Sequence, residues 1–182
     1  MITGIRRKNR NPNRQNNEKL FLVFAMICIA GAAAAQSGVV INGVTWATGN
    51  VGEPGTFVAH PEDFGNYYKH REVCPAGWRL PTQQEALSLV SSPSRWTTVN
   101  GVAGMQYGSD GNTIFLPAAG RERVKKRKSD LYVGTHGFYW TSTKVGLNSA
   151  HDLLFYEGFS GHPAGGVIQR KNGLTVRCVK DE

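Results

Sequence analysis

The chain has 182 residues, with 21 Lys and Arg against 13 Asp and Glu, which gives a formal net charge of +8. The first 35 residues hold six of these basic residues and one of the acidic residues, so residues 36–182 keep 15 basic and 12 acidic residues, a net charge of +3. This weak charge removes the basis for expecting a nucleic-acid partner. The remaining length suits one domain with one core.

The first 35 residues have the pattern of an export signal. Six basic residues, the last of them Lys19, precede an uncharged run of 16 residues from Leu20 to Ala35. Ala33 and Ala35 supply the small residues expected before a cut at Gln36. The run is short for a membrane span of ~20 residues. The sequence therefore predicts residues 1–35 as a signal peptide and residues 36–182 as an exported protein, with an uncleaved N-terminal anchor as the alternative.

Two elements are clear in the first half of the exported part. Residues 39–47 are β-branched and interrupted by Asn-Gly, which predicts a hairpin with a tight turn. Residues 48–73 are rich in Gly, Pro and aromatic residues, and we expect an irregular surface segment. Residues 82–90 predict a helix, because Thr82 and Glu85 have the spacing of a capping box. Ala86, Leu89 and Val90 form its expected buried stripe.

Strands dominate the second half. Short apolar, aromatic or β-branched runs predict strands at residues 112–117, 138–143, 151–156 and 174–179, separated by glycine-rich loops. No second apolar run is long enough for a membrane span. Together with the single helix, the pattern predicts an α+β domain with small sheets and long loops.

Two of the three cysteines belong to the exported part. Cleavage removes Cys28 with the signal and leaves Cys74 and Cys178 as one even pair. An even pair in an exported protein favours a disulfide, here between the middle of the domain and its last strand.

Four sequence motifs occur in order within residues 40–181. They are Cys74-Pro75-x-Gly77-Trp78-Arg79-Leu80-Pro81-Thr82-x-x-Glu85, Phe115-Leu116-Pro117-Ala118-Ala119-Gly120, Gly137-Phe138-Tyr139-Trp140-Thr141-Ser142-Thr143 and Val176-Arg177-Cys178-Val179. In this order they resemble the Fibrobacter succinogenes major paralogous domain, which is abundant in exported proteins of Bacteroidetes-type bacteria. The resemblance implies a variant of the C-type lectin fold, in which the N- and C-terminal strands pair. It also implies a disulfide between the start of the helix and the last strand, here Cys74 to Cys178.

Calcium binding does not follow from this resemblance. Calcium-dependent sugar binders of this fold use a Glu-Pro-Asn or Gln-Pro-Asp triplet and a Trp-Asn-Asp triplet, and neither occurs in the chain. Glu53-Pro54-Gly55 lacks the third oxygen ligand. Since a fold does not determine a function, we expect no metal and no cofactor.

Two groups of residues are candidates for ligand binding. The first comprises ring side chains in or beside the glycine-rich loops 119–137 and 144–172, which could stack on sugar rings or anchor a protein partner: Tyr132, His136, Tyr156, Phe159 and His162. The second belongs to the basic run of residues 121–128, which could hold an anionic glycan, a lipopolysaccharide head group or an acidic partner: Lys125, Lys126, Arg127 and Lys128. The alternatives are ordinary loop aromatics and a solvated basic loop.

Catalytic and metal-binding alternatives have weaker support. His60 with His70 is the best candidate for a metal site, but it lies in a loop-like segment without regular ligand spacing. Ser142 lacks the Gly-x-Ser-x-Gly setting of a nucleophile. Formylglycine-generating enzymes share the broad fold and use a cysteine pair, so a catalytic role of Cys74 and Cys178 remains an alternative to the disulfide.

The sequence thus predicts a non-catalytic binding module, exported to the periplasm, the outer surface or the medium. A protein or glycan ligand is expected on loops 119–137 and 144–172. A structural or tip component of a pilus or adhesin is the main alternative.

Overall fold

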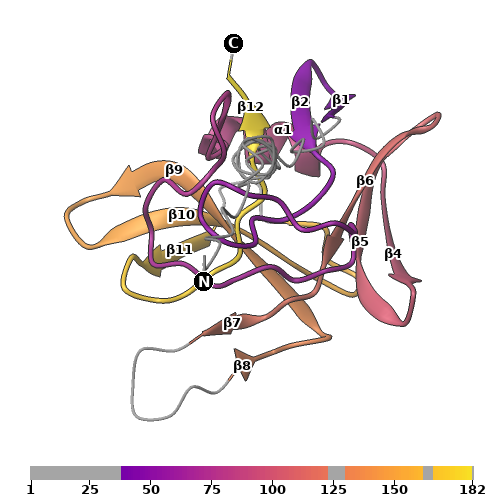
Figure 1. Cartoon of the computed structure of the whole chain (residues 1–182). Helices are drawn as coiled ribbons and strands as arrows, with labels where there is room; N and C mark the ends of the chain where they lie inside the picture. The colour runs from indigo at the N-terminus through magenta and orange to yellow at the C-terminus, as the bar shows by residue number, and fades with distance from the viewer. Residues whose placement is uncertain (1–37, 123–129, 162–165, 182) are drawn as a thin grey trace, which may run out of the picture. The chain divides into compact units, whose positions relative to one another are not determined.

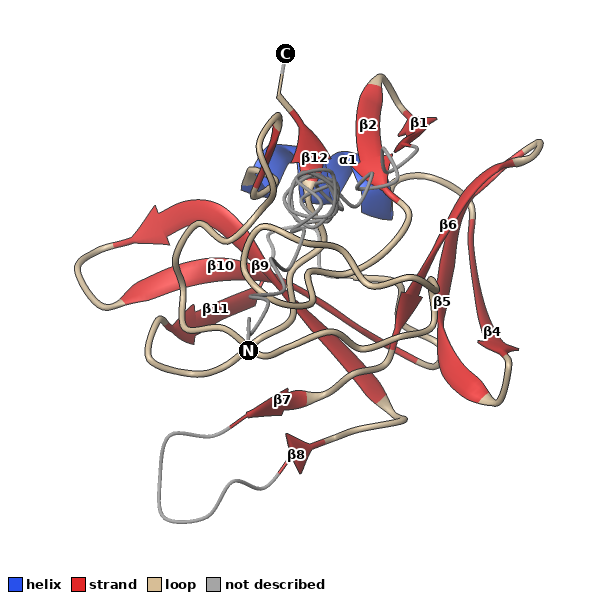
Figure 2. Ribbon diagram, in the orientation of Figure 1, coloured by secondary structure: helices blue, strands red, loops and turns tan. Residues whose placement is uncertain are grey.

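The computed structural model of the protein describes residues 38–122, 130–161 and 166–181. Three predictions lie outside these residues: the signal peptide, the basic side chains Lys125–Lys128 and the candidate His162. The described residues form one helix and twelve short strands in small antiparallel sheets, so the predicted α+β class is confirmed (Figure 2). In these ranges no helix is long and apolar enough to cross a membrane.

The first sheet joins the two ends of the domain. Its strand order is β1 (Gly38–Ile41), β2 (Val44–Ala47), β12 (Val179–Lys180) and β3 (Trp78–Arg79). The predicted hairpin of β1 and β2 is confirmed, and Asn42 and Gly43 make its turn with φ values of 49° and 81°. Both residues adopt the positive φ that the tightest hairpin turns require. Because β12 pairs with β2, the C-terminal strand lies beside the N-terminal hairpin (Figure 1).

The helix α1 (Gln83–Val90) begins where the sequence predicts. The Glu85 backbone N–H donates to Thr82 Oγ1 over 3.2 Å, and the Thr82 N–H donates to the Glu85 carboxylate over 2.6 Å. This capping box satisfies backbone groups that a helix N-terminus otherwise leaves unpaired. Ala86 and Leu89 are buried as expected, whereas Val90 is only half-buried.

A three-stranded meander follows the helix. Its strands are β4 (Ser94–Val99), β5 (Val102–Ser109) and β6 (Asn112–Pro117). The prediction for β6 is confirmed, but β4 and β5 were not predicted. Their turns contain Asn100-Gly101 and Asp110-Gly111, and all four of these residues have positive φ.

The longest ribbon lies in the third sheet. It consists of β9 (His136–Val145) and β10 (Ser149–Tyr156), with the shorter strand β11 (Gly166–Gln169) on the other side of β10 (Figure 1). Both long strands contain the predicted runs and extend beyond them. A bulge between Ala150 and Asp152 interrupts the β9–β10 register. The short strands β7 (Arg121–Glu122) and β8 (Asp130–Leu131) pair with each other.

The prediction of a strand at residues 174–179 is wrong over most of its length. Only Val179 belongs to a regular strand, while Leu174 and Thr175 form isolated bridges to Tyr68 and Tyr139. The segment is buried, but its carbonyl groups accept hydrogen bonds from three separate stretches of the chain. The donors are the backbone N–H groups of Tyr68, Trp140, Val51 and Ala47. No single neighbouring strand accompanies the segment, so it cannot form a continuous ladder.

The irregular segment 48–73 is not confined to the surface. It has no regular strand or helix, as predicted, but Val51, Tyr68 and His70 are buried in it. Val51 and Tyr68 belong to a core cluster with Trp140, Leu174 and other residues. The expectation of a surface segment is corrected because this stretch covers the C-terminal chain.

The disulfide between Cys74 and Cys178 is confirmed. The two Cα atoms lie 6.1 Å apart, and the bond joins residues 104 positions apart in the chain. It connects the segment just before β3 to the residue just before β12, so it fastens the C-terminal chain to the first sheet.

Candidate functional site

Four of the predicted ligand-binding residues lie together in one cluster of rings. Tyr132, His136, Tyr156 and Phe159 are linked by ring-to-ring contacts, with the buried ring of Phe138 beside them. We call these five side chains the aromatic cluster. They come from the turn before β9, the first residues of β9 and the end of β10, which meet at one end of the long ribbon.

The β9–β10 register brings the middle of the cluster together. His136 pairs with Tyr156 across the two strands, and their ring centroids are 4.9 Å apart. Tyr156 and Phe159 exchange two backbone hydrogen bonds of 2.9 Å, which close a tight turn containing Gly158 at φ 80°. The turn stacks the two rings at 4.8 Å with an interplanar angle of 21°.

Tyr132 is held in an unusual backbone conformation. Its φ of 67° lies in the left-handed region, which costs a residue with a side chain roughly 1–2 kcal/mol. Its carbonyl accepts hydrogen bonds from Thr135 N, Thr135 Oγ1 and His136 N at 3.1, 2.9 and 3.0 Å. These bonds fix the turn and direct the ring, which is 49% exposed, toward His136 at 4.8 Å.

A cation lies against the cluster. The guanidinium of Arg121 is 5.0 Å from the centroid of Phe138 and 5.8 Å from that of Tyr132, within the range of cation–π attraction. Its Nε atom is buried and has no hydrogen-bond partner among the described residues. Arg121 also attracts the buried carboxylate of Asp152, but burial dominates and raises the pKa of Asp152 to about 6. Burial lowers the pKa of His136, which favours the neutral form of its imidazole.

The cluster thus presents rings that are partly exposed, fixed in place and bordered by hydrogen-bonding groups. Tyr132 and Tyr156 expose 49% and 38% of their surface. Rings of this kind bind the apolar faces of sugars or the apolar side chains of a protein, while a phenol or imidazole bonds neighbouring polar groups. The turns fix these rings before a ligand binds, so binding would cost less side-chain conformational entropy.

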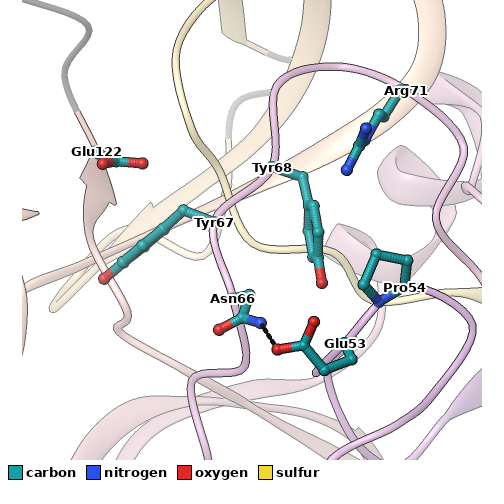
Figure 3. Close-up of a pocket in the computed structure, with 7 residues that line it drawn as sticks. All are labelled: Glu53, Pro54, Asn66, Tyr67, Tyr68, Arg71 and Glu122. Atoms are coloured by element: carbon teal, nitrogen blue, oxygen red, sulfur yellow. Dashed lines mark hydrogen bonds between the residues drawn. The ribbon is translucent and has the colours of Figure 1, made fainter.

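A polar hollow lies near the strand that carries Arg121. It has a volume of about 550 Å³, and its lining residues are drawn in Figure 3: Glu53, Pro54, Asn66, Tyr67, Tyr68, Arg71 and Glu122. Arg121 and Glu122 are consecutive in β7, and consecutive strand side chains point to opposite faces. The aromatic cluster and the hollow therefore lie on the two sides of β7.

The hydroxyl groups of the two tyrosines in the hollow are already used. Tyr67 donates to the carbonyl of Ala119, and Tyr68 donates to the carbonyl of Gly52. Glu53 accepts a hydrogen bond of 3.1 Å from Asn66, as Figure 3 shows. The charged groups around the hollow have both signs, with Glu53 and Glu122 against Arg71. Sequence reasoning missed this hollow, because Glu53-Pro54 was considered only as part of a calcium motif.

His70 has a structural role instead of the metal-binding role considered with His60. Its ring is buried, with Nε2 at 2.8 Å from the Thr141 carbonyl and Nδ1 at 3.2 Å from Arg170 Nε. Both ring nitrogens are therefore engaged. Across the described ranges, no three His, Cys, Asp or Glu side chains are grouped so that they could hold a metal ion.

Comparison of the chain with protein-family models, with curated proteins and with solved structures gave no match.

We expect calcium to leave the stability of the protein unchanged. A bound ion at a hundredfold excess over its Kd would add about 2.7 kcal/mol, which corresponds to a rise in melting temperature of roughly 3–6 °C. Thermal melts in millimolar calcium and in chelator should coincide. A clear rise in calcium would contradict this expectation and would make Asp110, Asp130, Asp152 and Glu157 the first residues to mutate.

Proposed function

We propose that this protein is an exported, non-catalytic binding module of the cell surface or the secreted fraction. Its ligand, a glycan or a protein, binds at the aromatic cluster, whose partly exposed rings Tyr132, His136, Tyr156 and Phe159 fall within residues 119–137 and 144–172. The observation that carries the proposal is the fixed arrangement of Tyr132, His136, Tyr156 and Phe159 at one end of the β9–β10 ribbon. The left-handed backbone of Tyr132 costs conformational free energy and keeps a large ring exposed, and such strain is typical of functional sites.

We also propose that the fold is a C-type-lectin-like variant of the Fibrobacter succinogenes major paralogous domain. Three observations support it: β12 pairs with the N-terminal hairpin, one helix accompanies small sheets, and the disulfide joins the segment before the helix to the end of the chain. The four sequence motifs that suggest the family also coincide with defined elements of the fold. They include the helix cap, the end of β6, the start of β9 and the buried C-terminal segment.

The disulfide also favours a binding module over an enzyme of the formylglycine-generating type. Cys74 and Cys178 are bonded to each other, so neither offers a free thiol. Cys178 is fully buried, which suits a structural bridge better than a reacting group.

The test is a variant that removes one ring and keeps the backbone. Asn tolerates the left-handed conformation better than most residues, so Tyr132→Asn should leave the melting temperature within about 3 °C of that of the wild type. Binding on a glycan array, or to an extract of outer-surface proteins, should fall at least about tenfold. Tyr132→Phe keeps the ring and should retain most of the binding.

The matched control is Val40→Ser on β1, which alters another exposed apolar side chain outside the cluster. It should leave binding unchanged. Undiminished binding by Tyr132→Asn and by Tyr156→Ser would place the ligand elsewhere and overturn the proposed site.

A further inference from the structure

A second hollow lies at the other end of the β9–β10 ribbon. Its volume is about 530 Å³, and three segments line it: residues 69–70, residues 147–148 at the β9–β10 turn, and residues 169–171 at the end of β11 and just beyond it. The aromatic cluster involves none of these residues, so this hollow is a separate feature of the molecule.

Backbone hydrogen bonds hold the three segments together. The N–H of His70 donates to the carbonyl of Arg170 over 3.0 Å, and the N–H of Arg170 donates to the carbonyl of Asn148 over 2.8 Å. Arg170 therefore occupies the middle position, tied to both neighbouring segments. The hollow is a fixed part of the fold and not a gap between independent loops.

The side chain of Arg170 is also fixed in direction. Its Nε–H donates to Nδ1 of His70 over 3.2 Å, and its NH1 group donates to the carbonyl of Leu147 over 3.3 Å. His70 is itself anchored, because Nε2 bonds the Thr141 carbonyl and the ring packs edge-on against Trp140 at 5.0 Å. With Nδ1 as acceptor and Nε2–H as donor, the imidazole is neutral. Burial, together with the nearby charges of Arg170 and Lys144, lowers the pKa of His70 and favours this neutral form.

The charge around the hollow is uniformly positive. Lys69, Arg170 and Lys171 contribute cations, Asn148 and Gln169 contribute amides, and none of the lining residues is acidic. The described residues contain two salt bridges, both made by Arg79, so none of these three cations has an ion-pair partner there. Like charges brought together without a counterion repel one another, and a bound anion relieves that repulsion.

We propose that this hollow binds a tetrahedral oxyanion, a phosphate or sulfate group. An arginine held by its Nε and NH1 groups still has further N–H donors, and a planar guanidinium fixed in advance suits the oxygen atoms of such a group. Lys69 and Lys171 are exposed, and their flexible ammonium groups add charge from the two flanking segments. This inference does not depend on the aromatic cluster.

Inorganic phosphate is the first probe. Isothermal titration of the protein at low ionic strength should show saturable binding, and chloride at matched ionic strength should show none. The double variant Lys69→Gln/Lys171→Gln changes only exposed side chains and should keep its melting temperature, yet its Kd should rise at least about tenfold. The control Lys180→Gln on β12 should bind phosphate like the wild type. Absence of saturable binding, or an unchanged Kd in the double variant, would overturn the proposal.

A second experiment identifies the source of the phosphate group. Leu147 is 89% exposed at the tip of the β9–β10 turn and lines the same hollow. In a lipid layer an apolar side chain at the rim would add binding energy that free phosphate cannot supply. If the group belongs to a lipid, the protein should sediment with phosphatidylglycerol vesicles but not with phosphatidylcholine vesicles, and Leu147→Asn should weaken this without changing the phosphate titration. Phosphate binding without sedimentation identifies a soluble phosphate or sulfate ester instead.

Discussion

Replacing Arg177 with Met is expected to lower the free energy of unfolding by about 3–5 kcal/mol. Arg177 is fully buried and uses three of its nitrogen atoms. Nε donates to Asn50 Oδ1 over 2.9 Å, NH1 donates to the Ala47 carbonyl over 3.1 Å, and NH2 donates to the Phe115 carbonyl over 3.0 Å. Met fills a similar volume but leaves these three acceptors buried without donors, and each unsatisfied group costs about 1–3 kcal/mol.

The loss should extend beyond one side chain, because Asn50 continues the network. Its Nδ2 group donates to the Phe64 carbonyl over 3.0 Å and to the Tyr139 hydroxyl over 3.3 Å, and Tyr139 in turn donates to the Pro117 carbonyl. Burial lowers the pKa of Arg177 to about 10. The guanidinium is therefore still charged at pH 7, and the substitution removes a cation as well as donors.

Urea unfolding followed by circular dichroism measures this effect. Arg95→Met is the matched control, because Arg95 is exposed on β4 and its guanidinium donates to Gln106 Oε1 over 2.9 Å at the surface. A change within about 0.5 kcal/mol is expected. If Arg177→Met proves as mild as the control, the buried network does not stabilise the fold as argued.

Loss of the disulfide should have a comparable effect. The bond closes a loop of 104 positions, and the chain-entropy model assigns about 4.7 kcal/mol to a loop of roughly 100 residues. Measured values for native disulfides are mostly about 2–5 kcal/mol. We expect the double variant Cys74→Ala/Cys178→Ala to unfold at a lower denaturant concentration by an amount in this range.

Reduction of the wild type provides the internal control. Reductant should lower the unfolding midpoint of the wild-type protein toward that of the double variant and should leave the double variant unchanged. A second check is chemical: a protein of residues 36–182, which lacks Cys28, should show no reactive thiol when it is denatured without reductant. Two reactive thiols, or equal stability of the variant and the oxidised wild type, would contradict the structural role of the bridge.

Local signals in the sequence were sufficient to predict several elements of the fold. The Asn42-Gly43 turn and the Thr82–Glu85 capping box each depend on contacts within a few residues, so their spacing alone predicts the hairpin and the helix start. The same logic would have found β4 and β5, because Asn100-Gly101 is an equally good turn signal. This hairpin was not predicted because β4, Ser94–Val99, lacks the alternation of apolar and polar residues that marks a strand.

The C-terminal segment shows what local signals cannot provide. Apart from Arg177, residues 174–179 are apolar or β-branched, but whether they form a strand depends on which segments of the chain lie beside them. Those neighbours come from residues 47, 51, 68 and 140, which are far away in the sequence. For the same reason, the second hollow, at the β9–β10 turn, was not predicted, since Lys69 and Arg170 are 101 positions apart and come together only in the fold.

The candidate aromatic residues were found for a physical reason. Large rings beside glycine-rich turns stay near the surface, because a loop that carries unpaired backbone groups is rarely buried. Their mutual contacts could not be predicted, because these require the register that sets His136 opposite Tyr156. Phe138 and Arg121 were not included among the candidates, and both complete the cluster.

The β9–β10 ribbon gives the domain a built-in spacing. The aromatic cluster lies at the end where His136 pairs with Tyr156, and the second hollow lies at the turn of residues 147–148. At about 3.3 Å per residue, the ten residues of β9 separate the two ends by about 30 Å. One small molecule cannot reach both ends, but an extended polymer that carries anionic groups can. Once one end of the domain has bound such a polymer, the second end meets it at a high effective concentration, so the overall affinity would exceed that of either contact alone. Shortening the ribbon by two paired residues would change the spacing and leave each end intact, so avidity for a polymer would fall while affinity for its fragments would not.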